Sequence, residues 1–296
     1  MNGLFVGLTT LDIIYLSETV PKSNEKIVAI DQVIAAGGPA TNAAVTFGYC
    51  GDRAVLLSVI GNHPLTQLII TDLVTHGVES IDLAPDQATS PSVSSIIITR
   101  ANGNRAIISL NAVKLQITPD HISKDILTDI DIVLIDGHQL AISEIIAQQA
   151  QQKNIPVVLD GGSWKPGLEK VLCHVNYTIC SANFYPPNCI NSQAVFTHLQ
   201  NLGISHIAIT NGGEPIEYYS EGKFGQVAVP VIQAVDTLGA GDIFHGAFCH
   251  YILQENFEDS LIAASKIASG ACQYFGTRKW LHHPLSSAKI NKSILI

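Results

Sequence analysis

Two kinds of apolar pattern alternate along this chain of 296 residues and predict a sheet covered by helices. The first is a short run that is apolar throughout, such as Ile132-Val133-Leu134-Ile135, which is typical of a parallel strand buried on both faces. The second repeats every three or four residues, as expected for the buried side of a helix. Strands are predicted at 4–8, 54–60, 131–136, 155–160, 176–180 and 206–210, and helices at 40–50, 65–76, 142–153, 192–202, 242–254 and 259–275. This alternation favours an α/β protein with a mostly parallel central sheet.

Two regions interrupt the alternation and predict a second, smaller sheet. Residues 12–17 and 27–35 have strand patterns with no helix between them. Residues 93–99 and 106–110 flank Asn102-Gly103-Asn104, whose Asn-Gly step is a strong signal for a hairpin turn. A small sheet over the strand ends would form a lid. An ordinary insertion at the edge of the main sheet explains the same pattern, so both interpretations stay open.

The composition and charge of the chain limit the kinds of molecule that it is expected to bind. Hydrophobic residues make up 47% of the chain and charged residues only 14%, which favours a globular fold over disorder. The formal net charge of −9 disfavours nucleic acid and anionic membranes as partners. A bound phosphate would therefore be held by local amides, metal ions or single basic residues.

Several features point to a protein of the cytoplasm. The six cysteines form no Cys-x-x-Cys pair, and the eleven histidines show no spacing typical of metal ligands. No basic segment precedes the first apolar strand, so no signal peptide is predicted. The uncharged stretch from Gln32 to Gly51 is interrupted by Gly37-Gly38-Pro39, which favours a buried loop and helix over a membrane span.

The most informative motif is Asp236-Thr237-Leu238-Gly239-Ala240-Gly241-Asp242, which leads into a predicted helix. Its two glycines let the backbone turn sharply and leave N–H groups uncovered, and such a helix start binds anions. Asp242 would repel a phosphate there unless it accepts a proton from the group that attacks the phosphate. An acidic residue that only compensates the helix dipole is the simpler alternative. The chain has no P-loop motif, and Phe244 stands where a dinucleotide fingerprint needs glycine.

A second motif, Gly37-Gly38-Pro39-Ala40-Thr41-Asn42-Ala43-Ala44, lies near the other end of the chain. Together the two motifs resemble the signatures of the PfkB (ribokinase-like) carbohydrate kinase family. The sequence at residues 102–105 and 236–242 is most similar to that of ketohexokinases. The sequence at residues 7–15 and 241–247 is similar to that of sulfofructose kinases. The resemblance implies a three-layer α/β/α fold with a small β-sheet lid, in a single kinase domain over residues 1–296 with lid segments at about 12–35 and 93–110.

The resemblance also assigns roles around the reacting groups. Asp242 would be the base that accepts the proton of a sugar hydroxyl, and the amides of Gly239, Ala240 and Gly241 would form the anion hole. Asp12 would hold sugar hydroxyls. The further residues implied to contact the sugar or its phosphate are Gly37, Gly38, Asn42 and Arg105. Judged without the family, Asn42 could be only a hydrogen-bonding residue near a helix start, and Arg105 could be only a solvated side chain.

ATP and Mg²⁺ are the cofactors that the resemblance implies. The residues implied to contact the nucleotide are Asn183, Thr210, Gly212, Thr237, Ser269 and Gly270. Asp236 matches a residue that helps bind a monovalent cation in some members, so the use of potassium stays open. Asp160 ends an apolar strand and either faces the nucleotide or metal or caps the next turn.

Two departures weaken the match on the nucleotide side. The family's Asn-x-x-Glu motif reads Asn183-Phe184-Tyr185-Pro186, so the glutamate that helps organise magnesium is absent. Pro215 stands where the family has a glycine after its Thr-x-Gly turn. A sensor that binds sugar or nucleotide without catalysis therefore remains an alternative to an active enzyme.

The sequence predicts an ATP-dependent sugar kinase that phosphorylates a primary hydroxyl of a ketose-like sugar. A nucleoside kinase of the same fold is the alternative within enzymes. The edge of a small lid sheet would also allow a homodimer.

Overall fold

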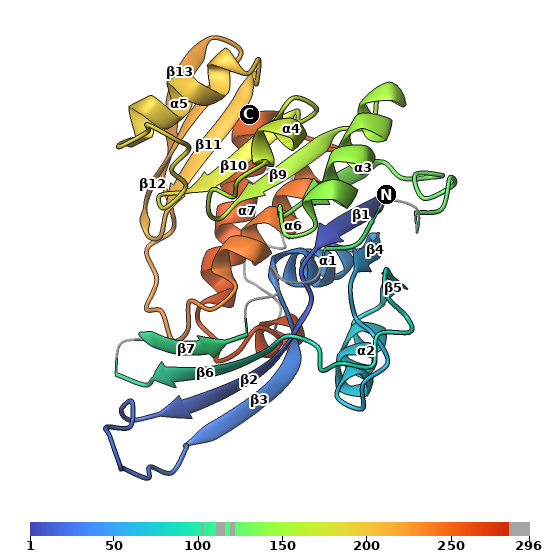
Figure 1. Cartoon of the computed structure of the whole chain (residues 1–296). Helices are drawn as coiled ribbons and strands as arrows, with labels where there is room; N and C mark the ends of the chain where they lie inside the picture. Colours follow the sequence, from blue (N-terminus) through green and yellow to red (C-terminus); the bar gives the residue numbers. More distant parts are fainter. Residues whose placement is uncertain (102, 111–115, 119–121, 284–296) are drawn as a thin grey trace.

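The computed structural model describes residues 1–101, 103–110, 116–118 and 122–283. Within these ranges, nine strands form one large sheet in the order β13-β12-β11-β10-β9-β8-β1-β4-β5 (Figure 1). These strands are β1 (Asn2–Gly7), β4 (Arg53–Ser58), β5 (Val78–Asp82), β8 (Ile132–Ile135), β9 (Val157–Gly161), β10 (Tyr177–Ser181), β11 (His206–Asn211), β12 (Glu214–Ser220) and β13 (Lys223–Val227). All pairs from β5 to β11 are parallel, and β12 and β13 add an antiparallel edge.

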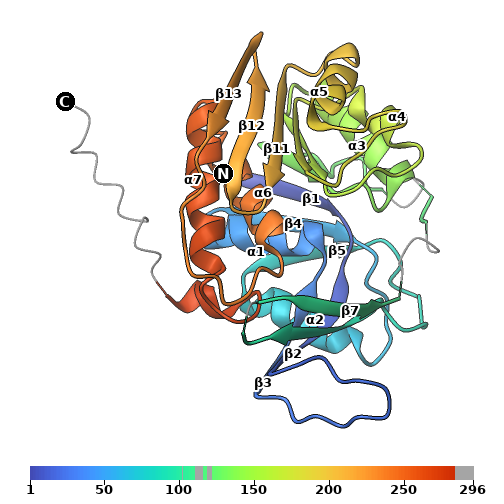
Figure 2. The same ribbon diagram turned by 90° about the vertical axis from the view of Figure 1, so that its left-hand side faces the viewer.

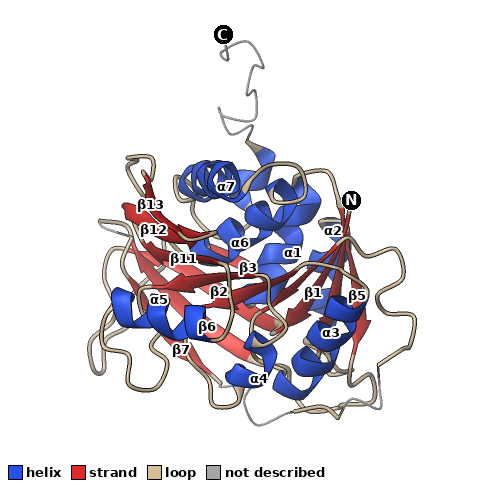
Figure 3. Cartoon of the chain, turned by 90° about the horizontal axis from the view of Figure 1, so that it is seen from above, coloured by secondary structure: helices blue, strands red, loops and turns tan. Residues whose placement is uncertain are grey.

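Helices cover both faces of the large sheet and give three layers (Figure 3). They are α1 (Pro39–Tyr49), α2 (Thr66–Thr75), α3 (Leu140–Gln152), α4 (Leu168–Leu172), α5 (Ser192–Asn201), α6 (Ala240–Tyr251) and α7 (Phe257–Ala271). One core joins α1, α2, α6 and α7 to one face through residues such as Phe47 and Phe248. A second core joins α3, α4 and α5 to the other face through residues such as Ile146 and Phe196. The strands are apolar on both sides because both faces are covered.

The small sheet lies beside one end of the large one, and Figure 2 shows it below the helices α1 and α7. Among the described residues its order is β3-β2-β6-β7, with β2 (Thr10–Ser17), β3 (Asp31–Gly37), β6 (Val93–Thr99) and β7 (Arg105–Ser109). Strand β2 follows β1 after only Leu8 and Thr9, so the two sheets share a continuous piece of chain. Ile14, Ile96 and Phe275 pack together beneath the small sheet.

The predicted three-layer fold with a second sheet is confirmed, and the differences lie at the edges. All six strands predicted for the large sheet are present, but β5, β12 and β13 were not predicted. These strands lie at the sheet's edges and mix buried with exposed positions, so they lack a uniform apolar run. The second strand of the small sheet begins at Asp31, not at residue 27. Helix α7 ends at Ala271, not at residue 275, and Gly276 with φ of +76° follows in the turn beyond it.

Among the described residues, no helix is both long enough and apolar enough to span a membrane.

Candidate functional site

The motif at 236–242 forms the start of helix α6. Gly239 is the N-cap residue with φ of +72°, a left-handed conformation that favours glycine, and the helix begins at Ala240. The N–H of Ile243 donates to Gly239 O at 2.8 Å, which is a regular helical bond. The Ala240 N–H makes a longer 3.3 Å bond to Thr237 O. The first turn of this twelve-residue helix therefore presents its positive end where the sequence predicts an anion hole.

Asp242 lies in this first turn and is held by a residue from the second motif. The Asn42 side-chain N–H₂ (Nδ2) donates to Asp242 Oδ2 at 2.8 Å, across 200 positions of sequence. The carboxyl group is partly exposed, but surrounding protein groups desolvate it. That desolvation, reinforced by the nearby Asp160 carboxylate, raises the pKa of Asp242 to about 7. A carboxyl group with such a pKa suits the acceptance of a proton near neutral pH.

Asp12 and the paired glycines lie together at the join between the small and large sheets. Asp12, on β2, is only 6% exposed and accepts a hydrogen bond from Thr10 Oγ1 at 2.7 Å. Burial raises the pKa of this carboxyl group. A Cβ atom on Gly37 would overlap the Asp12 carboxylate, and one on Gly38 would overlap Leu8 O. Glycine at 37 is therefore what lets the end of β3 approach Asp12.

Asp136 is a buried carboxylate that the sequence analysis did not single out. It follows β8 and accepts hydrogen bonds from the backbone N–H groups of Leu8 at 2.8 Å, His138 at 2.9 Å and Ala40 at 3.2 Å. A Cβ atom on Gly7 would overlap this carboxylate. Asp136 thereby fixes the crossing from β1 to β2 and the start of α1. A lone acidic residue directly after an apolar strand was the available signal.

The predicted nucleotide residues are brought together only in part. A cavity of about 350 Å³ opens beside the start of α6. Four residues for which nucleotide contact is predicted line it, namely Thr210, Gly212, Thr237 and Ser269, together with Ala240 and Gly241. Its remaining described lining is largely apolar, with Ile216, Val229, Phe244, Ala268 and Cys272 among the residues. Gly270 follows Ser269 on α7 but is not among the described lining residues.

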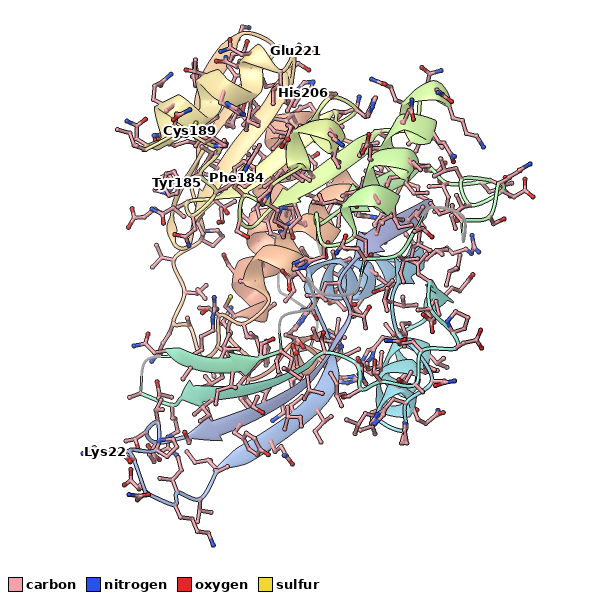
Figure 4. All side chains as sticks on the ribbon, in the orientation of Figure 1. Lys22, Phe184, Tyr185, Cys189, His206 and Glu221 are labelled. Atoms are coloured by element: carbon pink, nitrogen blue, oxygen red, sulfur yellow. The ribbon has the colours of Figure 1, made fainter. Side chains whose placement is uncertain are left out.

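Asn183 does not reach this cavity. It is exposed in the turn after β10, where its backbone N–H donates to Ser181 Oγ at 3.1 Å. The next two residues, Phe184 and Tyr185, lie beside the end of β10 (Figure 4). Phe184 is buried against Trp164, and Pro186 is also buried. The altered motif thus packs into the fold, and the described geometry does not place Asn183 with the other nucleotide residues.

Asp160 and His245 form a buried pair at the back of the site. Asp160 lies in β9, and burial raises its pKa. His245 Nδ1 lies 3.4 Å from Asp160 Oδ2 and 2.7 Å from Gly241 O, and His245 Nε2 lies 3.1 Å from Ile179 O. His245 also lines the cavity beside the start of α6, although no metal-ligand spacing distinguishes it in the sequence. In the described part of the chain, no three His, Cys, Asp or Glu side chains group as metal ligands.

Asp236 and Arg105 connect the small sheet to the loop before α6. Asp236 is 3% exposed, and its two oxygens accept backbone N–H bonds from Leu238 and Gly276, each at 2.8 Å. Burial raises the pKa of this carboxyl group. Arg105 Nη1 donates to Thr237 O at 3.3 Å and to Thr237 Oγ1 at 3.4 Å. Asp236 therefore shapes the turn, and Arg105 reaches from β7 to Thr237, while its contact with a substrate stays a prediction.

Arg278 is a buried residue near the site that the sequence did not indicate. It is 7% exposed and donates from Nη1 to Asn42 Oδ1 at 2.9 Å. It stands outside both motifs, 236 positions from Asn42, so no local pattern could have indicated the contact.

Comparison with known proteins identifies the family. The model of the "pfkB family carbohydrate kinase" matches residues 3–283. The ribokinase of Bacillus subtilis is 22% identical over 284 residues, which cover 94% of each chain. A crystal structure of a putative ribokinase from Agrobacterium tumefaciens has a TM-score of 0.83 at 23% identity, over 93% of this chain and 92% of that one. The structure of Arabidopsis thaliana ribokinase complexed with ribose and ATP has a TM-score of 0.71 at 22% identity, over 96% and 99%. This chain belongs to the pfkB family of carbohydrate kinases.

Proposed function

We propose that this kinase uses ATP to phosphorylate a primary hydroxyl of a ketose-like sugar. One observation carries the proposal: Asp242 lies at the start of α6 between Asn42, at 2.8 Å, and the nucleotide cavity that Gly241 lines. A base between an acceptor pocket and a phosphate-binding helix start is the arrangement that phosphoryl transfer to a hydroxyl requires.

The sugar would bind where β2, β3 and α1 meet. Asp12 would accept hydrogen bonds from sugar hydroxyls, and the second N–H of Asn42 would donate to the sugar. The reacting hydroxyl would then pass its proton to Asp242 as its oxygen attacks the terminal phosphorus of ATP. Amides at the start of α6, from Gly239 to Gly241, would stabilise the charge that develops on the phosphoryl oxygens. The small sheet would act as the lid that excludes water, with Arg105 as its contact to Thr237.

The nucleotide would occupy the cavity between α6, α7 and β12. Its apolar lining, including Ile216 and Ala268, suits a nucleotide base, and Thr237 and Gly241 would contact the phosphates from the end of the cavity at the start of α6. The ribokinase from Arabidopsis, whose structure contains ATP, has the same fold. Thr210, Gly212 and Ser269 would contact the nucleotide, whereas Asn183 and Gly270 remain predictions without this support.

Magnesium fits the chemistry of the donor set. Asp136, Asp160 and Asp242 make the site acidic, so a nucleotide polyphosphate needs a compensating cation. Bound Mg²⁺ would neutralise charge on the phosphates, and Asp160 is the carboxylate that would hold it through water. Both oxygens of Asp236 accept hydrogen bonds from backbone N–H groups. A potassium ion bound by Asp236 would therefore share a carboxylate that already stabilises a turn. Comparing rates in potassium and sodium salts tests that prediction.

The direct test is ADP release with ATP and magnesium against a panel of ketoses, aldoses, sugar phosphates and nucleosides. We expect turnover on a ketose-like sugar, with loss in Asp242→Asn. Turnover on adenosine alone would instead support the nucleoside kinase.

A non-catalytic sensor is the second candidate, and Pro186 at the place of the family's glutamate is the observation that favours it. It predicts that ATP raises the melting temperature although no panel member yields ADP. The homodimer through the small sheet also remains a prediction, for which sedimentation equilibrium is the measurement.

A further inference from the structure

Arg278 lies beside the proposed sugar site and donates hydrogen bonds from three nitrogens to four groups, one of which is the neighbouring backbone O of Thr277 at 3.2 Å. It follows α7 and precedes the short helix η3 (Lys279–His282). Nη1 donates to Asn42 Oδ1 at 2.9 Å, Nη2 to the backbone O of Ala36 at 2.6 Å, and Nε to Asp72 Oδ2 at 3.1 Å. Asp72 also accepts the backbone N–H of Ala36 at 3.0 Å. The guanidinium group is therefore fixed by α2 and by the end of β3 before it reaches Asn42.

These contacts determine which way the Asn42 amide faces. A guanidinium group can only donate hydrogen bonds, so the amide oxygen must face Arg278. The amide nitrogen then faces Asp242 Oδ2, where the distance is 2.8 Å. Turning the amide over would place N–H groups against the guanidinium and an oxygen against the carboxylate. Both contacts would be repulsive, so Arg278 selects the orientation in which Asn42 donates to Asp242.

We propose that Arg278 is a positioning residue for phosphoryl transfer, which holds Asn42 in the orientation that orders and stabilises the Asp242 carboxylate. This inference rests on the proposed function, because it assigns Asp242 the part of the base. Arg278 itself is buried and is not among the described residues that line the nucleotide cavity. Arg278 acts on Asp242 only through the side-chain amide of Asn42. The carboxylate of Asp72 compensates the charge of the guanidinium group.

Removing Arg278 has a defined electrostatic consequence. Burial, Asp160 and Asp136 all raise the pKa of Asp242, whereas the hydrogen bond from Asn42 and the nearby His245 lower it. Without Arg278 the Asn42 amide rotates freely and that hydrogen bond is lost for part of the time. The pKa of Asp242 then rises, and a smaller fraction of the enzyme has its base ionised at pH 7. The acidic limb of the kcat profile moves to higher pH, while the KM for ATP stays unchanged because the nucleotide cavity is untouched.

The test uses Arg278→Met, Arg278→Lys, Asn42→Ala and the double variant, with Lys279→Met as the matched control. Lys279 is the neighbouring residue, and it pairs with Asp31 at the surface. We expect Arg278→Met to displace the acidic limb upward by about one pH unit and to lower kcat at pH 7 about fivefold, because a rise of one unit from a pKa of about 7 reduces the ionised fraction by that factor. Because Arg278 acts through Asn42, adding Arg278→Met to Asn42→Ala should lower kcat no further. Lys279→Met should match the unsubstituted enzyme.

Three outcomes would overturn the inference. They are an unshifted pH profile in folded Arg278→Met, losses that add in the double variant, and an effect of Lys279→Met as large as that of Arg278→Met. If Arg278→Met does not fold, Arg278→Lys decides, since its ammonium group keeps a charge near Asp72 but donates from a single nitrogen and lacks the planar fork that reaches Asn42, Ala36 and Asp72 together. An unshifted profile in Arg278→Lys then rejects the proposal. Asp242→Asn distinguishes failure of the proposed function from failure of this inference. If that variant keeps full turnover, Asp242 is not the base and the proposed function itself fails.

Discussion

Asp242→Asn should make the protein more stable in alkaline solution while removing its activity. A carboxyl group whose pKa is raised by folding binds its proton more tightly in the folded than in the unfolded state. Its pKa is about 7 here against an ordinary 3.8, so the folded protein loses stability as the pH rises from 3.8 to 7. Asparagine keeps an oxygen that accepts the hydrogen bond from Asn42 and has no charge to desolvate.

The size of the effect follows from the same values. Each pKa unit corresponds to about 1.4 kcal/mol, so three units give about 4 kcal/mol at pH 8 as an upper limit. Because the carboxyl group is partly exposed, solvent screening reduces this limit, and we expect about 2 kcal/mol. For a chain of this size the gain is about 4 °C in melting temperature. Below pH 3.8 the two proteins should have the same stability.

Thermal melting of both proteins between pH 4 and pH 8 measures the difference, with the exposed Asp86→Asn as control. Turnover should fall by about 10²- to 10⁴-fold, the range for loss of one general base. The reasoning is refuted if the gain in melting temperature is the same at pH 4 and pH 8, because the raised pKa predicts a gain that grows from pH 3.8 and is complete only above about pH 7.

Further substitutions test the other parts of the site. Gly37→Ala should weaken sugar binding and cost about 1–3 kcal/mol of stability, because the added Cβ overlaps the Asp12 carboxylate. Calorimetry should show no loss of stability in the control Gly48→Ala, whose Cβ meets only His76 O at 3.6 Å. Ala268→Phe should fill the nucleotide cavity and raise the KM for ATP about tenfold, a loss of about 1.4 kcal/mol; an equal rise in the KM for sugar would contradict this. Arg105→Ala should change kcat/KM less than about fivefold, because the side chain is exposed and its two hydrogen bonds to Thr237 are long. A loss of a hundredfold in steady-state assays would assign it a stronger part.

The central strands and the start of α6 were predictable because their signals are local. A strand buried on both faces, such as β8, must be apolar throughout, and a tight turn into a helix needs glycine at a position such as 239. The edge strand β5 reads Val-Glu-Ser-Ile-Asp, with three consecutive exposed positions between buried and half-buried ones. Such a strand exists because a neighbour offers hydrogen bonds, not because of its own pattern.

The contacts that hold the site together were not predictable in the same way. Asp136 accepts hydrogen bonds from the backbone of Leu8 and Ala40, and Arg278 donates one to Asn42. In each case the partner lies far away in the sequence. A buried polar residue needs a partner, but one sequence does not say which one. The position of Asn183 was not predictable either, because the burial of Phe184 against Trp164 depends on residues outside the motif, and the contact of Asn183 with a nucleotide stays a prediction.

The two glycine–carboxylate contacts also limit how this site can evolve. Gly7 faces Asp136 and Gly37 faces Asp12 so closely that a single added methyl group cannot be accommodated while the acid is present. Replacing the acid first would leave room but remove the group that organises the site. Every stepwise path away from either pair therefore passes through an impaired enzyme, and natural or laboratory selection for a new sugar should act on other walls of the pocket.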